Sequence, residues 1–212
     1  MLSSSASLVD ELMAQLQGAP LQQLAQQLGT GTEQAQQAVG AALPLMFGAM
    51  GQNAAQPQGA AALFGALQRD YGAGGGLDLG GLLGSLLGGG ASAGNASPAA
   101  EGAAILGHIF GGNQQRAETG LGQATGLGGS NAGQLLTLLA PIVMAFLAQR
   151  MQAGGMNSGD LGQTLGQERE RAQQRGGLGG GLLGSLLDQD GDGQLGMGDL
   201  IKVGGSLFGG RR

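Results

Sequence analysis

Glycine constrains this chain more than any other residue, because 48 of its 212 residues are glycine. That share is roughly three times the ordinary one. A glycine inside a helix costs about 0.5–1 kcal/mol relative to alanine, while a folded domain is stable by only about 5–15 kcal/mol. We therefore expect most of the excess glycine to lie in loops and linkers.

The other residues favour helices over strands. Leu, Ala, Gln and Met dominate, whereas Ile and Val are scarce and aromatic residues make up only 3% of the chain. Unbranched side chains lose little freedom in a helix, and strands prefer the β-branched and aromatic types that are rare here. The composition predicts an all-α protein with a thin hydrophobic core.

The charge balance and the lack of cysteine exclude several classes of site. Fourteen acidic residues face nine basic ones, giving a net charge of −5, and no cysteine is present. Because nothing basic is concentrated along the chain, we expect no nucleic-acid binding. Disulfides and thiolate metal ligands are excluded. Residues 1–7 combine neither a basic segment nor an apolar core, so we expect no secretory signal and a cytoplasmic location.

Helix signals recur through the first third of the chain. A leucine at every fourth position, with Ser7 as the cap, predicts a helix over residues 8–16. Pro20 and Gly29 have the residue types that begin and end the next helix. Thr32 can cap a third helix, which we expect to be kinked or to restart after Pro44, since proline has no N–H to donate.

Residues 57–71 predict a fourth helix, which begins at a proline and turns Leu63, Phe64 and Leu67 inward. Ser97 and Pro98 then resemble the start of a helix that Gly111 and Gly112 end, with a weaker helix following to about residue 124.

The most apolar segment begins at Ser130, which we expect to cap it. Gln134, Thr137, Pro141 and Gln149 interrupt its apolar run before about 18 residues, so we interpret it as a buried core helix rather than a membrane span. Residues 160–175 predict a last helix with a charged tip that faces water. The tip comprises Glu168, Arg169, Glu170, Arg171 and Arg175.

Two internal repeats suggest a duplicated helical unit. Residues 81–87 and 181–187 are identical, and residues 44–52 align with residues 141–149. We therefore predict two related clusters of short helices joined by Gly-rich linkers. The expected bounds are 1–72 for the first helical module, 73–97 for a linker, 98–175 for the second module, and 176–212 for a Gly-rich segment with an acidic loop.

The acidic loop, residues 188–199, carries the one specific chemical signal. It has acidic residues at positions 1, 3, 5 and 12, glycine at position 6 and leucine at position 8, which is the pattern of an EF-hand calcium loop. Side-chain oxygens would come from four aspartates and a backbone carbonyl from position 7. The predicted ligands are Asp188, Asp190, Asp192, Gln194 and Asp199.

This loop predicts a weak site. Asp199 has a shorter arm than the usual glutamate, which makes bidentate ligation harder and admits Mg²⁺ as a competitor of Ca²⁺. The flanks are rich in glycine and no partner hand is present. We expect a dissociation constant of about 10⁻⁴–10⁻³ M. The alternative is that the loop is only a solvated acidic turn.

An enzymatic function is not expected. His108 is the only histidine and has no evident nucleophile or carboxylate partner, so we interpret it as a packed or surface residue rather than a base. Residues 179–184 match the G-x-G-x-x-G pattern but follow no predicted strand. Ser85 and Ser185 lack the flanking pattern of an activated serine.

A structural or self-associating role is the competing hypothesis. Leu- and Met-rich helical faces with little charge can associate with another copy of the chain or with a helical partner protein. The same faces can equally fill the protein's own core.

Blocks spread along the chain together resemble the bacterial YidB-like family, a domain of unknown function. These blocks are Leu-Pro-Leu-Met-Phe-Gly from residue 43, Gln-Gly-Ala-Ala-Ala-Leu-Phe-Gly-Ala-Leu from residue 58, Ile-Leu-Gly-His-Ile-Phe-Gly-Gly from residue 105, Leu-Ala-Pro-Ile-Val-Met from residue 139, and the acidic Gly-rich tail. The resemblance implies an all-helical bacterial protein with no assigned activity.

Overall fold

The computed structural model describes residues 7–71 and 98–174, and every regular element in these ranges is helical. This confirms the all-α prediction for the described part of the chain. Its elements, in order, are α1 (Leu8–Leu16), α2 (Ala19–Leu28), α3 (Thr32–Ala54), α4 (Pro57–Tyr71), α6 (Pro98–Phe110), a short 3₁₀ turn η1 (Gly111–Asn113), α7 (Gln114–Thr125), α8 (Gly129–Gly154) and α9 (Ser158–Gln174).

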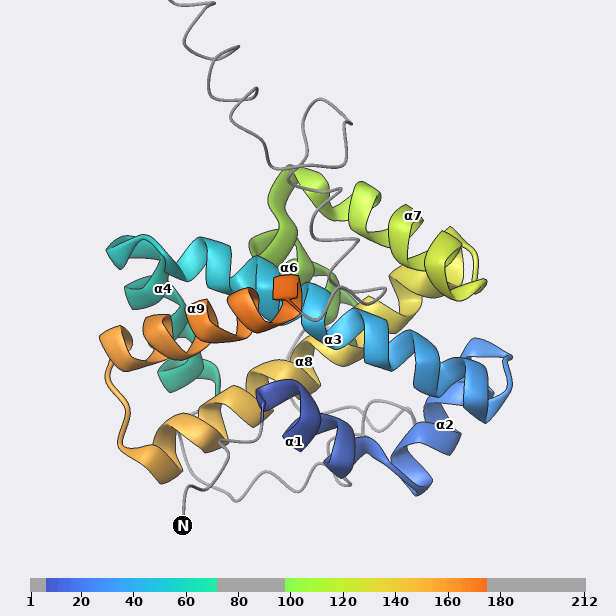
Figure 1. The fold of residues 1–212 in the computed structure, drawn as a ribbon, viewed down its shortest axis with the longest axis horizontal. Helices are drawn as coiled ribbons and strands as arrows, with labels where there is room; N and C mark the ends of the chain where they lie inside the picture. Colours follow the sequence, from blue (N-terminus) through green and yellow to red (C-terminus); the bar gives the residue numbers. More distant parts are fainter. Residues whose placement is uncertain (1–6, 72–97, 175–212) are drawn as a thin grey trace, which may run out of the picture.

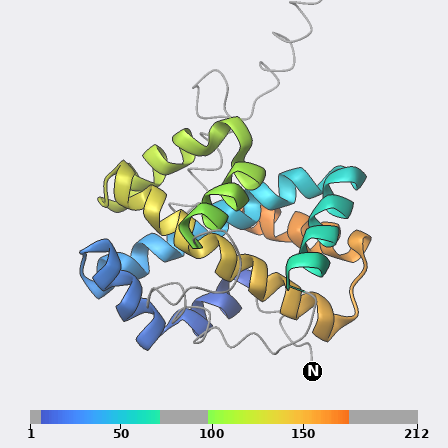
Figure 2. The ribbon, with the colours of Figure 1, turned by 180° about the vertical axis from the view of Figure 1, so that it is seen from behind.

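Two long helices, α3 and α8, cross the molecule and carry much of its core (Figure 1). Helix α9 lies along α3, while α1 and α2 lie at the lower edge of the same view. Seen from behind, α8 crosses the face with α6 lying against it (Figure 2). Buried side chains from α1 to α9 form one continuous hydrophobic cluster.

Helices from both predicted modules contribute to this single core. Leu45 and Phe47 of α3 are fully buried, as are Leu139 of α8 and Leu165 of α9. The aligned blocks at residues 44–52 and 141–149 each begin near the midpoint of a long buried helix and continue into its C-terminal half. The module bounds themselves stay a prediction. The predicted linker at 73–97 and the predicted Gly-rich segment at 176–212 lie outside the described residues.

Several predicted helix ends are confirmed. The Ser7 hydroxyl accepts a hydrogen bond from the Val9 amide at 3.2 Å and so caps α1. Gly29 has φ +63° and closes α2, and Gly111 with φ +55° follows the end of α6. Pro57 is the first residue of α4. Pro20 is the second rather than the first residue of α2, where its missing N–H is equally harmless.

Of the two alternatives expected at Pro44, a kink or a restart of the helix, the restart is wrong. Helix α3 runs from Thr32 to Ala54 with Pro44 inside it, and α8 likewise contains Pro141. An internal proline costs a helix about 3 kcal/mol. The residues on both sides of Pro44 are buried in the core, and burying a large apolar side chain contributes about 1.5–3 kcal/mol each. Core packing therefore offsets the local cost.

Two predicted caps are also wrong. Gly31 precedes α3 and Gly128 precedes α8, whereas Thr32 and Ser130 lie just inside these helices. Neither glycine provides a side chain for capping, so the first turns of α3 and α8 lack a side-chain cap.

The charged tip of α9 does not face water as a whole. Glu168 is only 3% exposed and accepts a hydrogen bond from the Ser7 hydroxyl at 2.7 Å. Arg171, one turn further along α9, donates to the same carboxylate at 2.6 Å. Glu168 is thus a buried, paired carboxylate that ties α9 to the start of α1.

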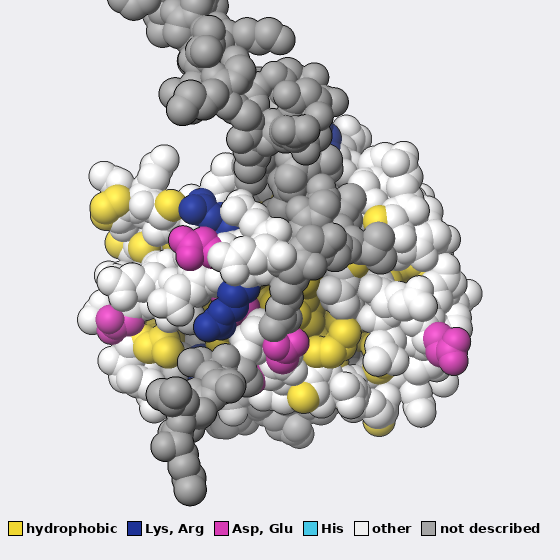
Figure 3. All heavy atoms as spheres, viewed as in Figure 1, with side chains coloured by type: hydrophobic (Ala, Val, Ile, Leu, Met, Phe, Trp, Pro, Cys, Tyr) yellow, Lys and Arg dark blue, Asp and Glu magenta, His cyan; other side chains and the backbone are white. Residues whose placement is uncertain are grey.

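Helix α8 is long and apolar enough to cross a membrane by length and composition, and 78% of its most apolar window is buried within the fold. The buried residues of α8 are part of the hydrophobic core that the described helices share. On the face shown in Figure 3, the described charged side chains are scattered, and uncharged groups form most of the surface.

Candidate functional site

The predicted cation loop cannot be located in the fold. Asp188, Asp190, Asp192, Gln194 and Asp199 all lie outside the described residues. Within residues 7–71 and 98–174, no group of three or more His, Asp or Glu side chains is placed to hold a metal ion. The loop therefore stays a sequence prediction.

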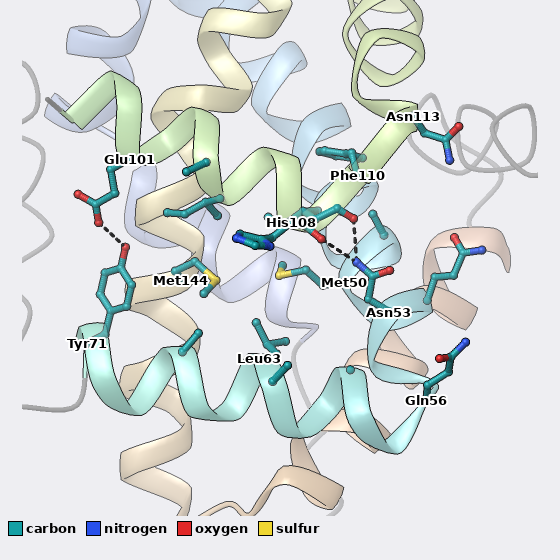
Figure 4. Close-up of a pocket in the computed structure, with 18 of the residues that line it drawn as sticks. Met50, Asn53, Gln56, Leu63, Tyr71, Glu101, His108, Phe110, Asn113 and Met144 are labelled. Carbon is teal, nitrogen blue, oxygen red and sulfur yellow. Dashed lines mark hydrogen bonds between the residues drawn. The ribbon is translucent and has the colours of Figure 1, made fainter. Parts of the chain in front are cut away.

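The described residues form a pocket of about 890 Å³ between α4 and α6 (Figure 4). Helix α4 lies along one side and α6 along the other, while α3 and α8 contribute residues behind them. This volume falls within the range of about 300–1,000 Å³ that is typical of small-molecule sites.

Apolar side chains form much of the pocket wall. Met50 of α3 and Met144 of α8 are buried, with exposures of 2% and 6%. Leu63 of α4 and Ile105 of α6 are partly buried and line opposite sides. Methionine adapts its shape easily, which suits a surface that receives an apolar ligand.

Asn53 fixes one end of the pocket. Its side-chain amide donates to the backbone carbonyls of His108 at 3.1 Å and Ile109 at 2.9 Å. These carbonyls belong to the last turn of α6, where helical backbone has no hydrogen-bonding partner of its own. Asn53 therefore anchors the end of α6 to the end of α3.

Tyr71 and Glu101 join the two sides at the other end. The Tyr71 hydroxyl, at the last residue of α4, lies 3.2 Å from the Glu101 carboxylate near the start of α6. The Gln152 amide of α8 donates to the Tyr71 carbonyl at 3.4 Å. These contacts hold α4 and α6 on opposite sides of the pocket.

His108 lies on the wall between these two ends. Its side chain lines the pocket together with Met50 and Met144 (Figure 4). The residue is exposed rather than buried, which agrees with its interpretation as a packed or surface residue. No described side chain forms an ion pair or hydrogen bond with its ring nitrogens, so the described residues show no acid–base pair at this position.

The sequence did not predict this pocket. Its walls come from four helices, and its polar residues, such as Asn53, Tyr71 and Glu101, follow no recognisable spacing. His108 is the lining residue that the sequence analysis weighed as a possible base, and nothing in the sequence linked it to the others. A pocket assembled by packing leaves no contiguous motif.

Residues 10–150 match a family model described as "Bacterial protein of unknown function (DUF937)". The match spans α2 to α7 completely and ends within α8, so it does not reach the acidic loop. The match shows a bacterial family of unknown function, and it does not support the YidB-like name. No curated protein and no solved structure matches the chain.

Proposed function

The chain belongs to the DUF937 family of bacterial proteins of unknown function, and we propose that it is a non-enzymatic protein that binds a divalent cation through residues 188–199. The observation that carries this proposal is the register of the acidic loop. Four aspartates occupy ligand positions 1, 3, 5 and 12, with the glycine that the sharp turn requires at position 6.

The physical reason to expect binding is electrostatic. Four carboxylates within twelve residues repel one another when no cation is bound, and a divalent ion relieves this repulsion. Calcium is the ion that the ligand pattern favours, and magnesium competes because Asp199 is a short closing ligand. We propose that the bound cation stabilises the structure of the loop and that it does not act as a calcium-dependent switch.

Calorimetric titration of the full chain with Ca²⁺ and with Mg²⁺ tests this proposal. We expect one site with a dissociation constant of about 10⁻⁴–10⁻³ M for Ca²⁺. Asp188→Ala should weaken binding at least tenfold. The matched control Glu33→Ala, which removes an exposed carboxylate from the first turn of α3, should leave binding unchanged. Null titrations with both ions, identical in wild type and Asp188→Ala, would rule the proposal out.

A cytoplasmic location would leave so weak a site mostly without Ca²⁺. In that case Mg²⁺ occupies the loop, the protein is exported from the cytoplasm, or packing against the helical body raises the affinity. A metal titration of the full chain, compared with that of a peptide spanning residues 182–205, separates the last explanation from the others.

The alternative proposal is a structural protein that associates with itself or with a helical partner, in which the acidic loop is only a solvated turn. Partly buried apolar residues on α4 and α6, such as Leu63, Phe64 and Ile105, are the described side chains that favour it. Light scattering over a range of protein concentrations distinguishes the two, because a monomer at every concentration argues against self-association.

A further inference from the structure

The pocket between α4 and α6 is held at both ends before any ligand arrives. Asn53 ties the last turn of α6 to α3, and the hydrogen bond between Tyr71 and Glu101 ties α4 to the start of α6. A cavity fixed in this way does not have to be opened by its ligand. Such preorganisation lowers the entropy that binding costs.

The pocket combines an apolar interior with a few polar groups, as ligand sites usually do. Met50 and Met144 are buried at its back, while Leu63 and Ile105 face it from opposite helices. Together they present a surface for an aliphatic group. Burying such a group removes apolar area from water, which is the main source of binding free energy.

One cationic side chain on the pocket, Arg69, is open to an anionic ligand. Arg69 and His108 both line the pocket, and neither has an ion-pair partner among the described residues. Arg69 uses its Nε to donate to the Gly65 carbonyl at 3.2 Å, which holds the guanidinium close to its own helix. Glu101 is the one carboxylate among the lining residues, and it lies at the end of the pocket where it accepts a hydrogen bond from the Tyr71 hydroxyl.

We propose that this pocket binds a small amphipathic carboxylate, with its aliphatic chain against Met50, Met144 and Leu63 and its head group bound by the Arg69 guanidinium and by a hydrogen bond from the His108 ring. A carboxylate matches the two parallel donors of a guanidinium. The proposal is independent of the cation loop, since it uses only described residues far from it in the sequence.

Calorimetry with the full chain tests the proposal, with dodecanoate and dodecylammonium as probes below their micelle concentrations. The two molecules have the same aliphatic chain and opposite head-group charge. We expect saturable binding of dodecanoate at one site and at least tenfold weaker binding of dodecylammonium. Equal binding of the two probes, or no saturable binding of dodecanoate, would overturn the proposal.

Substitutions then locate the site. Ala62 of α4 and Ala104 of α6 are exposed residues on opposite walls, so Ala62→Trp and Ala104→Trp should each fill the pocket without disturbing the core. Each should weaken dodecanoate binding at least tenfold while the circular dichroism of the helices is retained. Two variants are used because, if one of them fails to fold, the other still tests whether dodecanoate binds in this pocket. Undiminished binding by a folded variant with a filled pocket contradicts the proposal.

Removing the basic groups tests the head-group assignment. The double variant Arg69→Gln with His108→Gln should bind the two probes within about threefold of each other, because only the aliphatic contacts remain. Arg116→Gln, which removes an exposed arginine of α7 outside the pocket, should keep the preference for dodecanoate. A preference that survives the double variant would show that these residues do not recognise the head group.

Discussion

Glu168 shows how one residue can depart from its local sequence context. Its neighbours are charged, and its stretch resembles a solvated helix tip, yet its carboxylate is 3% exposed. The cause is Ser7, a residue 161 positions away, whose hydroxyl donates to it. Burial that depends on so distant a partner cannot be predicted from neighbouring residues, and a buried charge is tolerated only when it is paired.

Replacing Ser7 by alanine should lower the free energy of unfolding by about 1–3 kcal/mol. The change removes the side-chain cap of α1 and one of the hydrogen bonds to buried Glu168. Urea unfolding followed by circular dichroism measures the loss. Ser130→Ala is the matched control, since Ser130 is exposed inside α8 and caps no helix, and its effect should stay within about 0.5 kcal/mol. Equal losses would contradict the assigned roles.

At the scale of helices, a capping serine, glycines and a proline correctly indicated where several elements begin and end. Ser7, Gly29, Pro57 and Gly111 all mark helix ends, because their preferred backbone or side-chain geometry acts locally. At Pro44 the helix does not restart, and the reason is not local. The free energy gained by burying the neighbours of Pro44 comes from other helices, so the sequence of α3 alone does not reveal that a proline is tolerated there.

Glycines inside the described helices have a role that the composition did not predict. In the described ranges most glycines lie inside helices rather than in loops, and some occupy helix crossings. A Cβ on Gly102 of α6 would lie 2.2 Å from the Thr137 carbonyl oxygen of α8, and one on Gly51 of α3 would lie 2.5 Å from the Leu165 carbonyl oxygen of α9. At these crossings glycine allows two backbones to approach, which offsets its cost in the helix.

Gly102→Ala and Gly107→Ala should therefore change stability in opposite directions. Alanine at 102 forces α6 away from α8 and should cost about 1–3 kcal/mol. Alanine at 107 of the same helix meets no atom within 4 Å and should stabilise by about 0.5–1 kcal/mol, because it restricts the unfolded chain. Denaturant midpoints of the two variants provide the comparison. A loss at both positions would argue against the close crossing of α6 and α8.

For the whole molecule, the sequence indicated a duplicated helical unit but not how the copies meet. The described helices share one core, in which α3 from the first half lies against α9 from the second. The pocket depends on the same arrangement, because α4 and α6 belong to different halves. Which apolar faces pair with one another is decided by complementary shape across the core, and helical periodicity identifies the faces without identifying their partners.

The most direct test of this shared core is to produce residues 1–72 alone and compare their urea unfolding with that of the full chain. Separating α1 to α4 from the other helices would expose side chains such as Phe47 and Leu45, which are fully buried in the intact fold. We predict that the fragment shows no cooperative unfolding transition, whereas the full chain unfolds in one. A cooperative transition of the fragment at the midpoint of the full chain would contradict the account.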